Sequence, residues 1–341
     1  MLLIRRLFVR SATRAALFVV MGILILSAVR PASALGKLDH VQQTSSKEAA
    51  DAVDRGNSHY SQGLYEQAVA DYTQAITLDP EYAEAYNNRG LAYYELKKYD
   101  EAITDLTQAI ALDPEYAKAY NNRGLVYKNQ GLYDQAIADL NRAIELMPQN
   151  AAAYNNRGLT YYHQQKYEQA LADLNHALTL DPQNTTIYSN RGLVYYDQQK
   201  YEQALADLSH ALTLDPQNAH AYDNRGLVYS AQKKYEEALA DFNQAITLDP
   251  QNAHAYDNRG LLYVTQGQYE QAIADYTHSI EIDPASEDAY LGRGNVYALQ
   301  HHAQEAIADY LKYDSLSDKP IGQWIDALRT FFLGLIPQTC S

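Results

Sequence analysis

Asparagine recurs at a fixed 34-residue spacing through the middle of this 341-residue chain. The six copies are Asn88, Asn122, Asn156, Asn190, Asn224 and Asn258. A side-chain amide carries both donors and an acceptor, so it can pair with a peptide backbone group in either direction. A row of such amides could hold an extended chain without requiring a particular sequence. The spacing therefore points to contact with another polypeptide rather than to catalysis.

Arginine and aspartate recur at the same period as the asparagines. Arg89 and Asp105 are one example, and the same pair occurs in eight successive segments of the chain. Repetition of a guanidinium and a carboxylate at one spacing is typical of a structural ion pair. We therefore expect one Arg–Asp pair in each segment, stacked into a ladder. In the competing geometry, each arginine pairs with the acid before the proline of the preceding segment, for example Arg89 with Asp79.

The other reactive residues do not form a recognisable catalytic or metal site. The histidines recur one segment apart, as His220 and His254 do, which is too far for two equivalent atoms to share a metal ion. The single cysteine, Cys340, excludes an internal disulfide and a thiolate metal site. No hydrolase, phosphate-loop or dinucleotide-binding motif occurs. The sequence thus predicts a protein that is not an enzyme and holds no cofactor.

Each segment needs two helices to bring these residues onto one surface. We number each segment so that its Arg-Gly pair, such as Arg89-Gly90, occupies positions 7 and 8. Small or apolar residues then fall at positions 4, 8, 11, 20, 24 and 27, which is the spacing of helices. Glycine at position 15 in three segments fits a turn, and proline at position 32 in seven segments ends the second helix. The segments are 49–82, 83–116, 117–150, 151–184, 185–218, 219–252, 253–286 and 287–320.

This 34-residue segment resembles the tetratricopeptide repeat (TPR). Residues 85–114, AYNNRGLAYYELKKYDEAITDLTQAIALDP, match its pattern closely, and the resemblance covers residues 49–320. It implies an all-α fold, a right-handed α-solenoid superhelix of eight TPR helix-turn-helix units. One departure is systematic, because the family prefers leucine at position 7 and this chain has arginine there in every repeat.

The resemblance also implies a binding face. In TPR proteins, positions 2, 5, 6, 9, 12 and 13 of the first helix line the inner, concave surface, so the six asparagines at position 6 would lie on it. This arrangement resembles the asparagine ladder with which the TPR superhelix of O-GlcNAc transferase grips peptide backbone. Leucines at position 9 and tyrosines at position 12 would contribute beside them: Leu125, Leu159, Tyr94, Tyr162 and Tyr196. The alternative is that the asparagines cap or bridge local backbone.

The first 34 residues differ from the repeats. An arginine-rich start precedes a 15-residue apolar run, Ala15 to Val29, and a small-x-small cleavage site follows at residues 31–34. The pattern predicts a secretory signal peptide over residues 1–34 and an exported protein, periplasmic or secreted. The alternatives are an uncleaved membrane anchor and, from Arg5-Arg6, a twin-arginine export signal. Residues 35–48 are predicted as a spacer and the start of the first helix, with a capping box from Ser45 to Glu48.

Residues 321–341 continue the repeat frame beyond the eighth repeat. Trp324 falls at position 4 and Phe331 at position 11, which predicts a C-terminal capping helix over repeat 8. The alternative is a helix over residues 321–336 that docks on a membrane surface or a partner, because Phe332, Leu333 and Leu335 add apolar surface.

Charge narrows the class of partner. The chain has a formal net charge of −15, and removal of the five arginines in residues 1–34 would change it to −20. Such a surface repels nucleic acid and favours basic or neutral partners. The sequence therefore predicts a protein–protein interaction scaffold that binds other proteins or peptides. The alternatives are a self-associating structural or membrane-associated spacer and a non-catalytic regulatory subunit of an enzyme. The sequence does not determine the oligomeric state.

Overall fold

The computed structural model describes residues 32–317, and its side chains from Ser45 onward. This range contains sixteen α-helices and no strand. The segment 1–31 of the predicted signal peptide and the predicted capping helix at 321–341 lie outside the described residues. The chain divides into two compact parts, an N-terminal part over residues 1–130 and a C-terminal part over residues 131–341.

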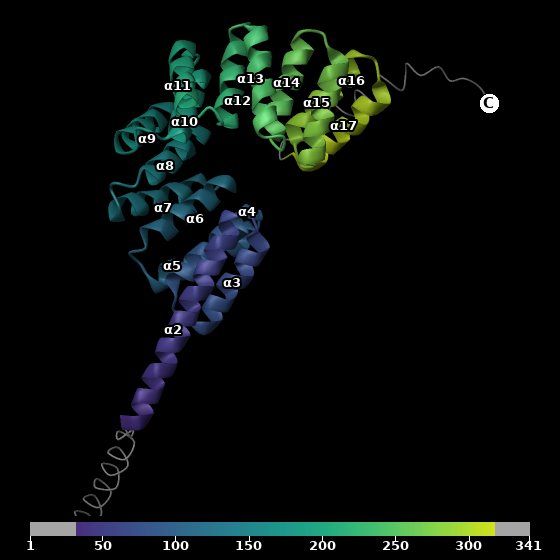
Figure 1. The fold of residues 1–341 in the computed structure, drawn as a ribbon. Helices are drawn as coiled ribbons and strands as arrows, with labels where there is room; N and C mark the ends of the chain where they lie inside the picture. Colours follow the sequence, from purple (N-terminus) through teal and green to yellow (C-terminus); the bar gives the residue numbers. More distant parts are fainter. Residues whose placement is uncertain (1–31, 318–341) are drawn as a thin grey trace, which may run out of the picture. The chain divides into compact units, whose positions relative to one another are not determined.

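The helices alternate between 13 and 14 residues after a longer first helix (Figure 1). The N-terminal part contains α2 (Ala32–Ser61), α3 (Tyr65–Leu78), α4 (Ala83–Glu95), α5 (Tyr99–Leu112) and α6 (Ala117–Asn129). The C-terminal part contains α7 (Tyr133–Leu146), α8 (Ala151–His163), α9 (Tyr167–Leu180), α10 (Thr185–Asp197), α11 (Tyr201–Leu214), α12 (Ala219–Ala231), α13 (Tyr235–Leu248), α14 (Ala253–Thr265), α15 (Tyr269–Ile282), α16 (Glu287–Leu299) and α17 (Ala303–Leu316). Even-numbered helices are the first helices of the repeats and odd-numbered helices the second. The boundary between the parts falls inside repeat 3, between α6 and α7.

A left-handed residue turns the chain between the two helices of every repeat. Gly63, Gly131 and Gly267 take φ values of +74°, +73° and +73° at position 15, as the sequence predicts. The other five repeats place non-glycine residues there at φ between 58° and 62°: Lys97, Gln165, Gln199, Lys233 and His301. The repeat geometry therefore imposes this conformation even where a side chain makes it unfavourable.

Helix α2 extends beyond the predicted start of the first repeat. It runs without a break from Ala32, so the prediction of a spacer over residues 35–44 is wrong, and the capping box at Ser45 does not begin a helix. No proline interrupts residues 35–61, and most of them are compatible with helix. The Ser45 hydroxyl instead donates to the carbonyl oxygen of Leu78 at 2.8 Å, which ties α2 to the end of α3.

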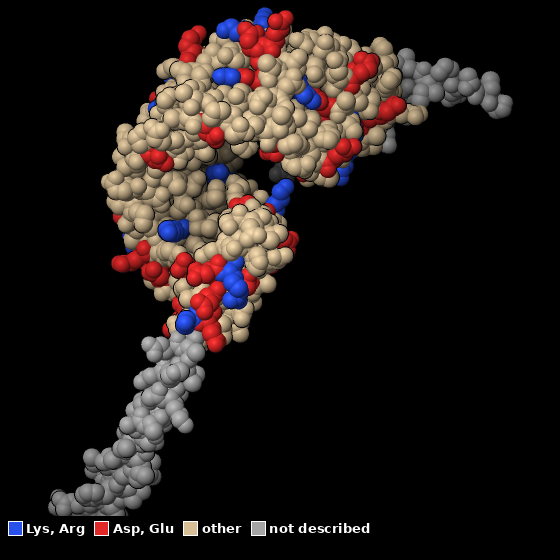
Figure 2. Space-filling view, viewed as in Figure 1, with Lys and Arg blue, Asp and Glu red and all other residues tan. Residues whose placement is uncertain are grey.

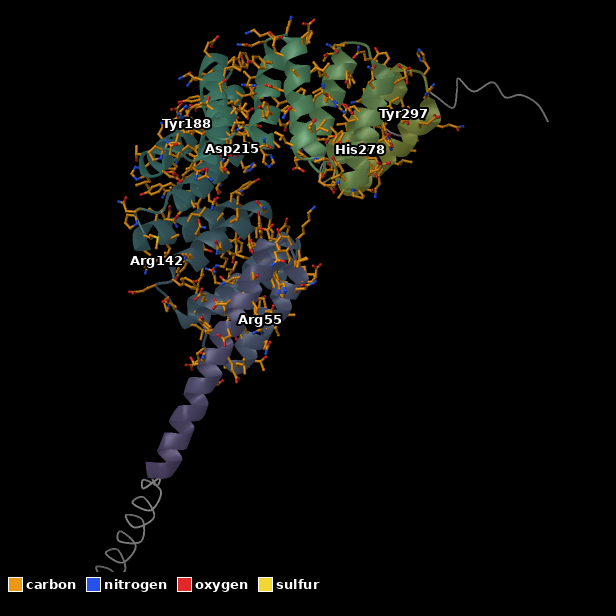
Figure 3. All side chains as sticks on the ribbon, viewed as in Figure 1. Arg55, Arg142, Tyr188, Asp215, His278 and Tyr297 are labelled. Carbon is orange, nitrogen blue, oxygen red and sulfur yellow. The ribbon has the colours of Figure 1, made fainter. Side chains whose placement is uncertain are left out.

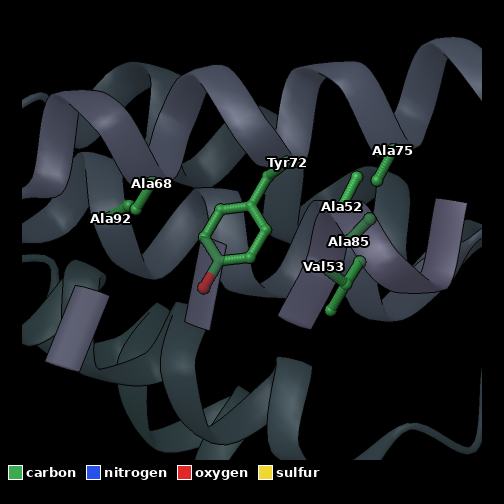
Figure 4. Packing of buried hydrophobic residues seen from close by; sticks show 7 residues of the cluster. All are labelled: Ala52, Val53, Ala68, Tyr72, Ala75, Ala85 and Ala92. Atoms are coloured by element: carbon green, nitrogen blue, oxygen red, sulfur yellow. The ribbon is translucent and has the colours of Figure 1, made fainter. Parts of the chain in front are cut away.

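Small residues set the distance between paired helices. In repeat 1, the buried ring of Tyr72 at position 24 packs among alanines from three helices (Figure 4). A Cβ atom at Gly56, position 8, would lie 2.5 Å from the Tyr72 ring. Glycine at position 8 is thus required by the bulky side chain at position 24 of the same repeat. The stacked hairpins within each part define an all-α solenoid of helix-turn-helix units.

Candidate protein-interaction surface on the first helices

Positions 6, 9 and 12 lie three residues apart on each first helix, so their side chains share one face. We call this the first-helix face. In the N-terminal part it includes the half-buried side chains of Asn88, Asn122, Leu125 and Tyr94. In the C-terminal part it includes the half-buried Asn156, Asn190, Asn224, Asn258, Leu159, Tyr162 and Tyr196. Partial burial leaves these groups accessible while their positions are fixed by the helices.

The asparagines at position 6 bond to the preceding repeat. Asn122 Nδ2 donates to Asn87 Oδ1 at 2.9 Å, and Asn190 Nδ2 donates to Asn155 Oδ1 at 2.8 Å. In both cases the acceptor occupies position 5 of the repeat before. Asn258 follows the same rule and donates to Asp223. Asn88 differs, because its acceptor, Asn57, occupies position 9 of the repeat before. These amides therefore bridge neighbouring repeats through side chains, not through local backbone as the alternative interpretation supposed.

The bridging bonds do not use all of the amide hydrogens. Each side-chain amide nitrogen carries two hydrogens, and a bridge to position 5 occupies one. Asn224 has no side-chain hydrogen bond within residues 45–317. The reason lies in the preceding repeat, where the Ser189 hydroxyl at position 5 donates to the Thr185 carbonyl at 2.9 Å instead. Asn224 is thus the predicted contact residue with the most unused hydrogen-bonding capacity.

The tyrosines at position 12 form a second row of contacts between repeats. The Tyr60 hydroxyl donates to Glu95 Oε1 at 3.0 Å, and Asn129 Nδ2 donates to the Tyr94 hydroxyl at 2.8 Å. Glu95 and Asn129 both occupy position 13 of the following repeat. Burial, together with the Asp197 carboxylate, raises the pKa of Tyr162. Lys128 interrupts the row at repeat 3, and the row ends after repeat 5, because repeats 6 to 8 have Ser230, Val264 and Ala298 at position 12.

The arginines at position 7 form the predicted ion pairs with position 23. Arg89 Nε and Nη2 donate to the two oxygens of Asp105 at 2.6 and 2.7 Å, so the pairing of Arg89 with Asp79 is wrong. The same bidentate geometry occurs in five more repeats, at Arg157–Asp173, Arg191–Asp207, Arg225–Asp241, Arg259–Asp275 and Arg293–Asp309. At the end of the array Arg55, labelled in Figure 3, has a single longer contact with Asp71, 3.2 Å.

In six of the eight repeats the arginine also bonds to a side chain of the preceding repeat, which sequence reasoning missed. Arg191 Nη1 donates to Asn175 Oδ1 at 2.6 Å, and its guanidinium carbon lies 5.6 Å from the centre of the Tyr188 ring. Asn175 occupies position 25 of the repeat before. The same bond links Arg157 to Asn141 and Arg259 to Asn243. In these repeats the arginine that departs from the family's leucine therefore joins both helices of its own repeat and the repeat before it.

The asparagine row stops at repeat 8, where Gly292 occupies position 6. Asp257, at position 5 of repeat 7, consequently lacks an asparagine donor, and its Oδ1 is buried without a hydrogen-bond partner. Burial raises the pKa of Asp257 to about 6, and the nearby Asp288 adds to the effect. The carboxylate is therefore a local source of instability near neutral pH.

Replacing Asp257 with asparagine should stabilise the protein near neutral pH. The folded-state pKa of about 6 exceeds the value of about 3.9 expected in the unfolded chain, so the folded protein binds this proton more tightly. Stability from this group is then lost as pH rises from about 4 to about 6. Thermal unfolding of Asp257→Asn across this range should show a smaller decline than the parent, whereas the exposed Glu236→Gln should follow the parent. Equal declines in all three proteins would contradict the assignment.

Five histidines lie against tyrosine rings: His163, His176, His210, His278 and His302. His176 lies 4.3 Å from Tyr154 between ring centres, and His278 (Figure 3) lies 4.5 Å from Tyr256. Across residues 45–317, no group of three or more His, Cys, Asp or Glu side chains is arranged to hold a metal ion. None of the helices α2 to α17 combines the length and apolar character needed to cross a membrane. On the face shown in Figure 2, acidic and basic side chains are interspersed and most of the surface carries neither.

Comparison with known families assigns this fold. The model described as TPR repeat matches residues 56–97, 90–131, 160–199 and 192–233. Models described as tetratricopeptide repeat match residues 226–293, 117–150 and 140–172. These matches together cover most of the described helices. The chain belongs to the tetratricopeptide repeat family, whose members are generally non-catalytic scaffolds for protein–protein interaction.

Solved structures share the fold at low sequence identity. A chain of the APC/C hetero-tetramer Cut9–Hcn1 matches with a TM-score of 0.65 and 16% identity, over 83% of this chain and 55% of that one. This chain therefore spans just over half the length of that relative. A tetratricopeptide repeat protein from Parabacteroides merdae ATCC 43184 matches with a TM-score of 0.57 and 22% identity, over 74% of this chain and 98% of that one. No curated protein matches the chain.

Proposed function

We propose that this protein is an interaction scaffold that binds an extended peptide, or an extended segment of a partner protein, along the first-helix face. The observation that carries the proposal is the half-buried Asn224, whose amide has no side-chain hydrogen-bond partner within the described residues. It lies in a row with Asn190 and Asn258, which each use one amide hydrogen for the bridge to the preceding repeat. The remaining donors and acceptors can pair with peptide C=O and N–H groups.

Apolar contacts would supply much of the affinity. Leu261, at position 9 of repeat 7, is 56% exposed, and the leucines at position 9 of repeats 2 to 6 are half-buried. Burial of a leucine side chain contributes about 1.5–3 kcal/mol, more than a typical neutral hydrogen bond contributes. The amides would then hold the peptide backbone while the leucines contact its apolar side chains.

The net charge of the chain and its predicted signal peptide indicate the class of partner. The formal net charge of −15 favours a basic or neutral partner, because an acidic one would be repelled. Export through a signal peptide over residues 1–34 would place the scaffold in the periplasm or outside the cell. The partner would then be another exported protein or the exposed segment of a membrane protein.

Two single substitutions on the first-helix face should weaken binding of such a partner. Asn224→Ala removes an amide that bonds to nothing else in the described structure, so we expect a loss of about 2- to 10-fold in affinity. Leu261→Asp removes an exposed apolar contact and should weaken binding by about 10-fold or more. A partner captured with the mature protein would be purified, and its affinity for each variant measured by calorimetry.

A matched control separates this face from the rest of the molecule. Gln108 is exposed on the second helix α5, so Gln108→Ala should bind as the parent does. Circular dichroism checks that all three variants are folded. Parental affinity in both Asn224→Ala and Leu261→Asp would contradict the proposal. If sedimentation showed a mass that grows with concentration and no partner bound, the protein would be a self-associating spacer instead.

A further inference from the structure

Repeat 8 ends in a face unlike the one that every earlier repeat offers to its successor. At six of the seven junctions between repeats, position 25 provides a polar acceptor for the arginine of the next repeat, as Asn243 does for Arg259; the exception is Ser209, which has no bond to Arg225. Position 25 is polar in all of the first seven repeats: Thr73, Thr107, Asn141, Asn175, Ser209, Asn243 and Thr277. In repeat 8 this position is Leu311, which is 41% exposed. The surface cannot receive another arginine in the same way.

The acceptor for the asparagine is missing as well. Position 5, which accepts from the next repeat's asparagine at Asp223, is Leu291 in repeat 8. Position 12, where several earlier repeats have a hydrogen-bonded tyrosine, is Ala298. Leu291 and Ala298 pack against the buried Ala306 and Tyr310. We call Leu291, Ala298 and Leu311 the end face; each of its residues is apolar where an earlier repeat bonds to its successor.

The sequence that follows repeat 8 is apolar at positions that would meet the apolar end face. Four residues separate α15 from α16, and four residues separate the end of α17 at Leu316 from Ile321. In the same register, position 7 is Ala327, not arginine, and position 8 is Leu328, not glycine. The polar pair of arginine and its acceptor is thus replaced on both sides by the apolar pair of Ala327 and Leu311.

Leu328, at position 8 of this register, bears on whether a second helix can pack over the segment. In repeat 6, a Cβ atom at Gly226 would lie 2.6 Å from the ring of Phe242, which belongs to the second helix of that repeat. A side chain at position 8 is therefore incompatible with a second helix packed in the usual place. Leu328 fits a first helix that has no second helix over it, and its side chain can fill the space that a position-24 residue would occupy.

We propose that residues 321–336 dock on the end face of repeat 8 as the first helix of an incomplete ninth repeat. Trp324, Leu328 and Phe331, at positions 4, 8 and 11, turn toward repeat 8, and Ala327 packs on Leu311. The segment then closes the array against addition of another repeat or another copy of the chain. Because the same apolar side chains would have to enter a bilayer, docking excludes the use of this segment as a membrane anchor.

Trp324 is the only tryptophan of the chain, so its fluorescence reports directly on docking. In the unaltered protein we expect emission shifted to the blue and weak quenching by acrylamide. Leu311→Asp should shift the emission to the red and increase quenching. Leu311→Asn, which restores the residue type of earlier repeats, should shift the emission in the same direction. It keeps the test usable if Leu311→Asp perturbs folding. Leu299→Asp is the matched control, since Leu299 is 55% exposed but occupies position 13, which contacts the preceding repeat.

Three outcomes would overturn the proposal. The first is emission of a solvent-exposed indole in the unaltered protein, or emission that neither Leu311 variant changes. The second is a blue shift that disappears on dilution, which would identify a second copy of the chain as the occupant. The third is a further blue shift on addition of anionic phospholipid vesicles, which would identify the segment as a membrane-binding helix.

Discussion

Replacing Arg191 with leucine should lower the free energy of unfolding by about 3–5 kcal/mol. The substitution leaves the Asp207 carboxylate, only 10% exposed, without the guanidinium that pairs with both of its oxygens. It also removes the bond to Asn175, so the preceding repeat loses an attachment, and it removes the contact with the Tyr188 ring of the same repeat. Urea unfolding followed by far-UV circular dichroism measures the change. The family's own leucine at this position is thus expected to be harmful in this chain.

Two variants test the cause of that loss. Arg191→Leu combined with Asp207→Leu removes both charges, and it should recover much of the stability, because the large cost comes from the unpaired buried carboxylate. Arg142→Ala removes an exposed pair with Glu145, 44% and 64% exposed, so it should change stability by about 1 kcal/mol or less. A double variant no more stable than Arg191→Leu would show that the charge pair is not the reason for the arginine.

Replacing Gly226 with alanine should lower the free energy of unfolding by about 1–3 kcal/mol, although alanine is the better helix former. The new methyl group would lie 2.6 Å from the fully buried ring of Phe242, so α12 and α13 must separate or the ring must leave its rotamer. Thermal unfolding compares this variant with Gly260→Ala. There the methyl group would lie 3.2 Å from the Tyr276 ring, which requires a smaller shift, and the loss should be smaller. Equal losses would show that the distance between helices is not set at position 8.

Much of the fold could be predicted because the determinants lie within one repeat. The spacing of Gly90 and Ala102, and of Arg89 and Asp105, is a property of a single helical hairpin, so periodicity in the sequence predicts it. The bidentate pair at Arg89 confirms that prediction. The left-handed turn could be predicted from glycine at three repeats only, because Lys97 and its equivalents carry no local sign of a positive φ.

Contacts between repeats were the part that sequence reasoning missed. The bonds from Asn122 to Asn87 and from Arg191 to Asn175 depend on how far one hairpin is offset from the next. That offset is set by packing, and no spacing within a repeat encodes it. The candidate asparagines could be identified from their chemistry and period, but their partners at position 5 could not. The continuation of α2 before residue 45 was missed because a capping-box pattern also occurs inside helices.

Hydrogen exchange of the protein with and without its purified partner tests the central claim most directly. If an extended peptide binds along the first-helix face, slower exchange should appear in the first helices α10, α12 and α14, with little change in the second helices α11, α13 and α15. Asn224→Ala should reduce the protection in proportion to its lower affinity. Protection confined to the second helices, or to the turns between helices, would contradict the account and place binding on another surface.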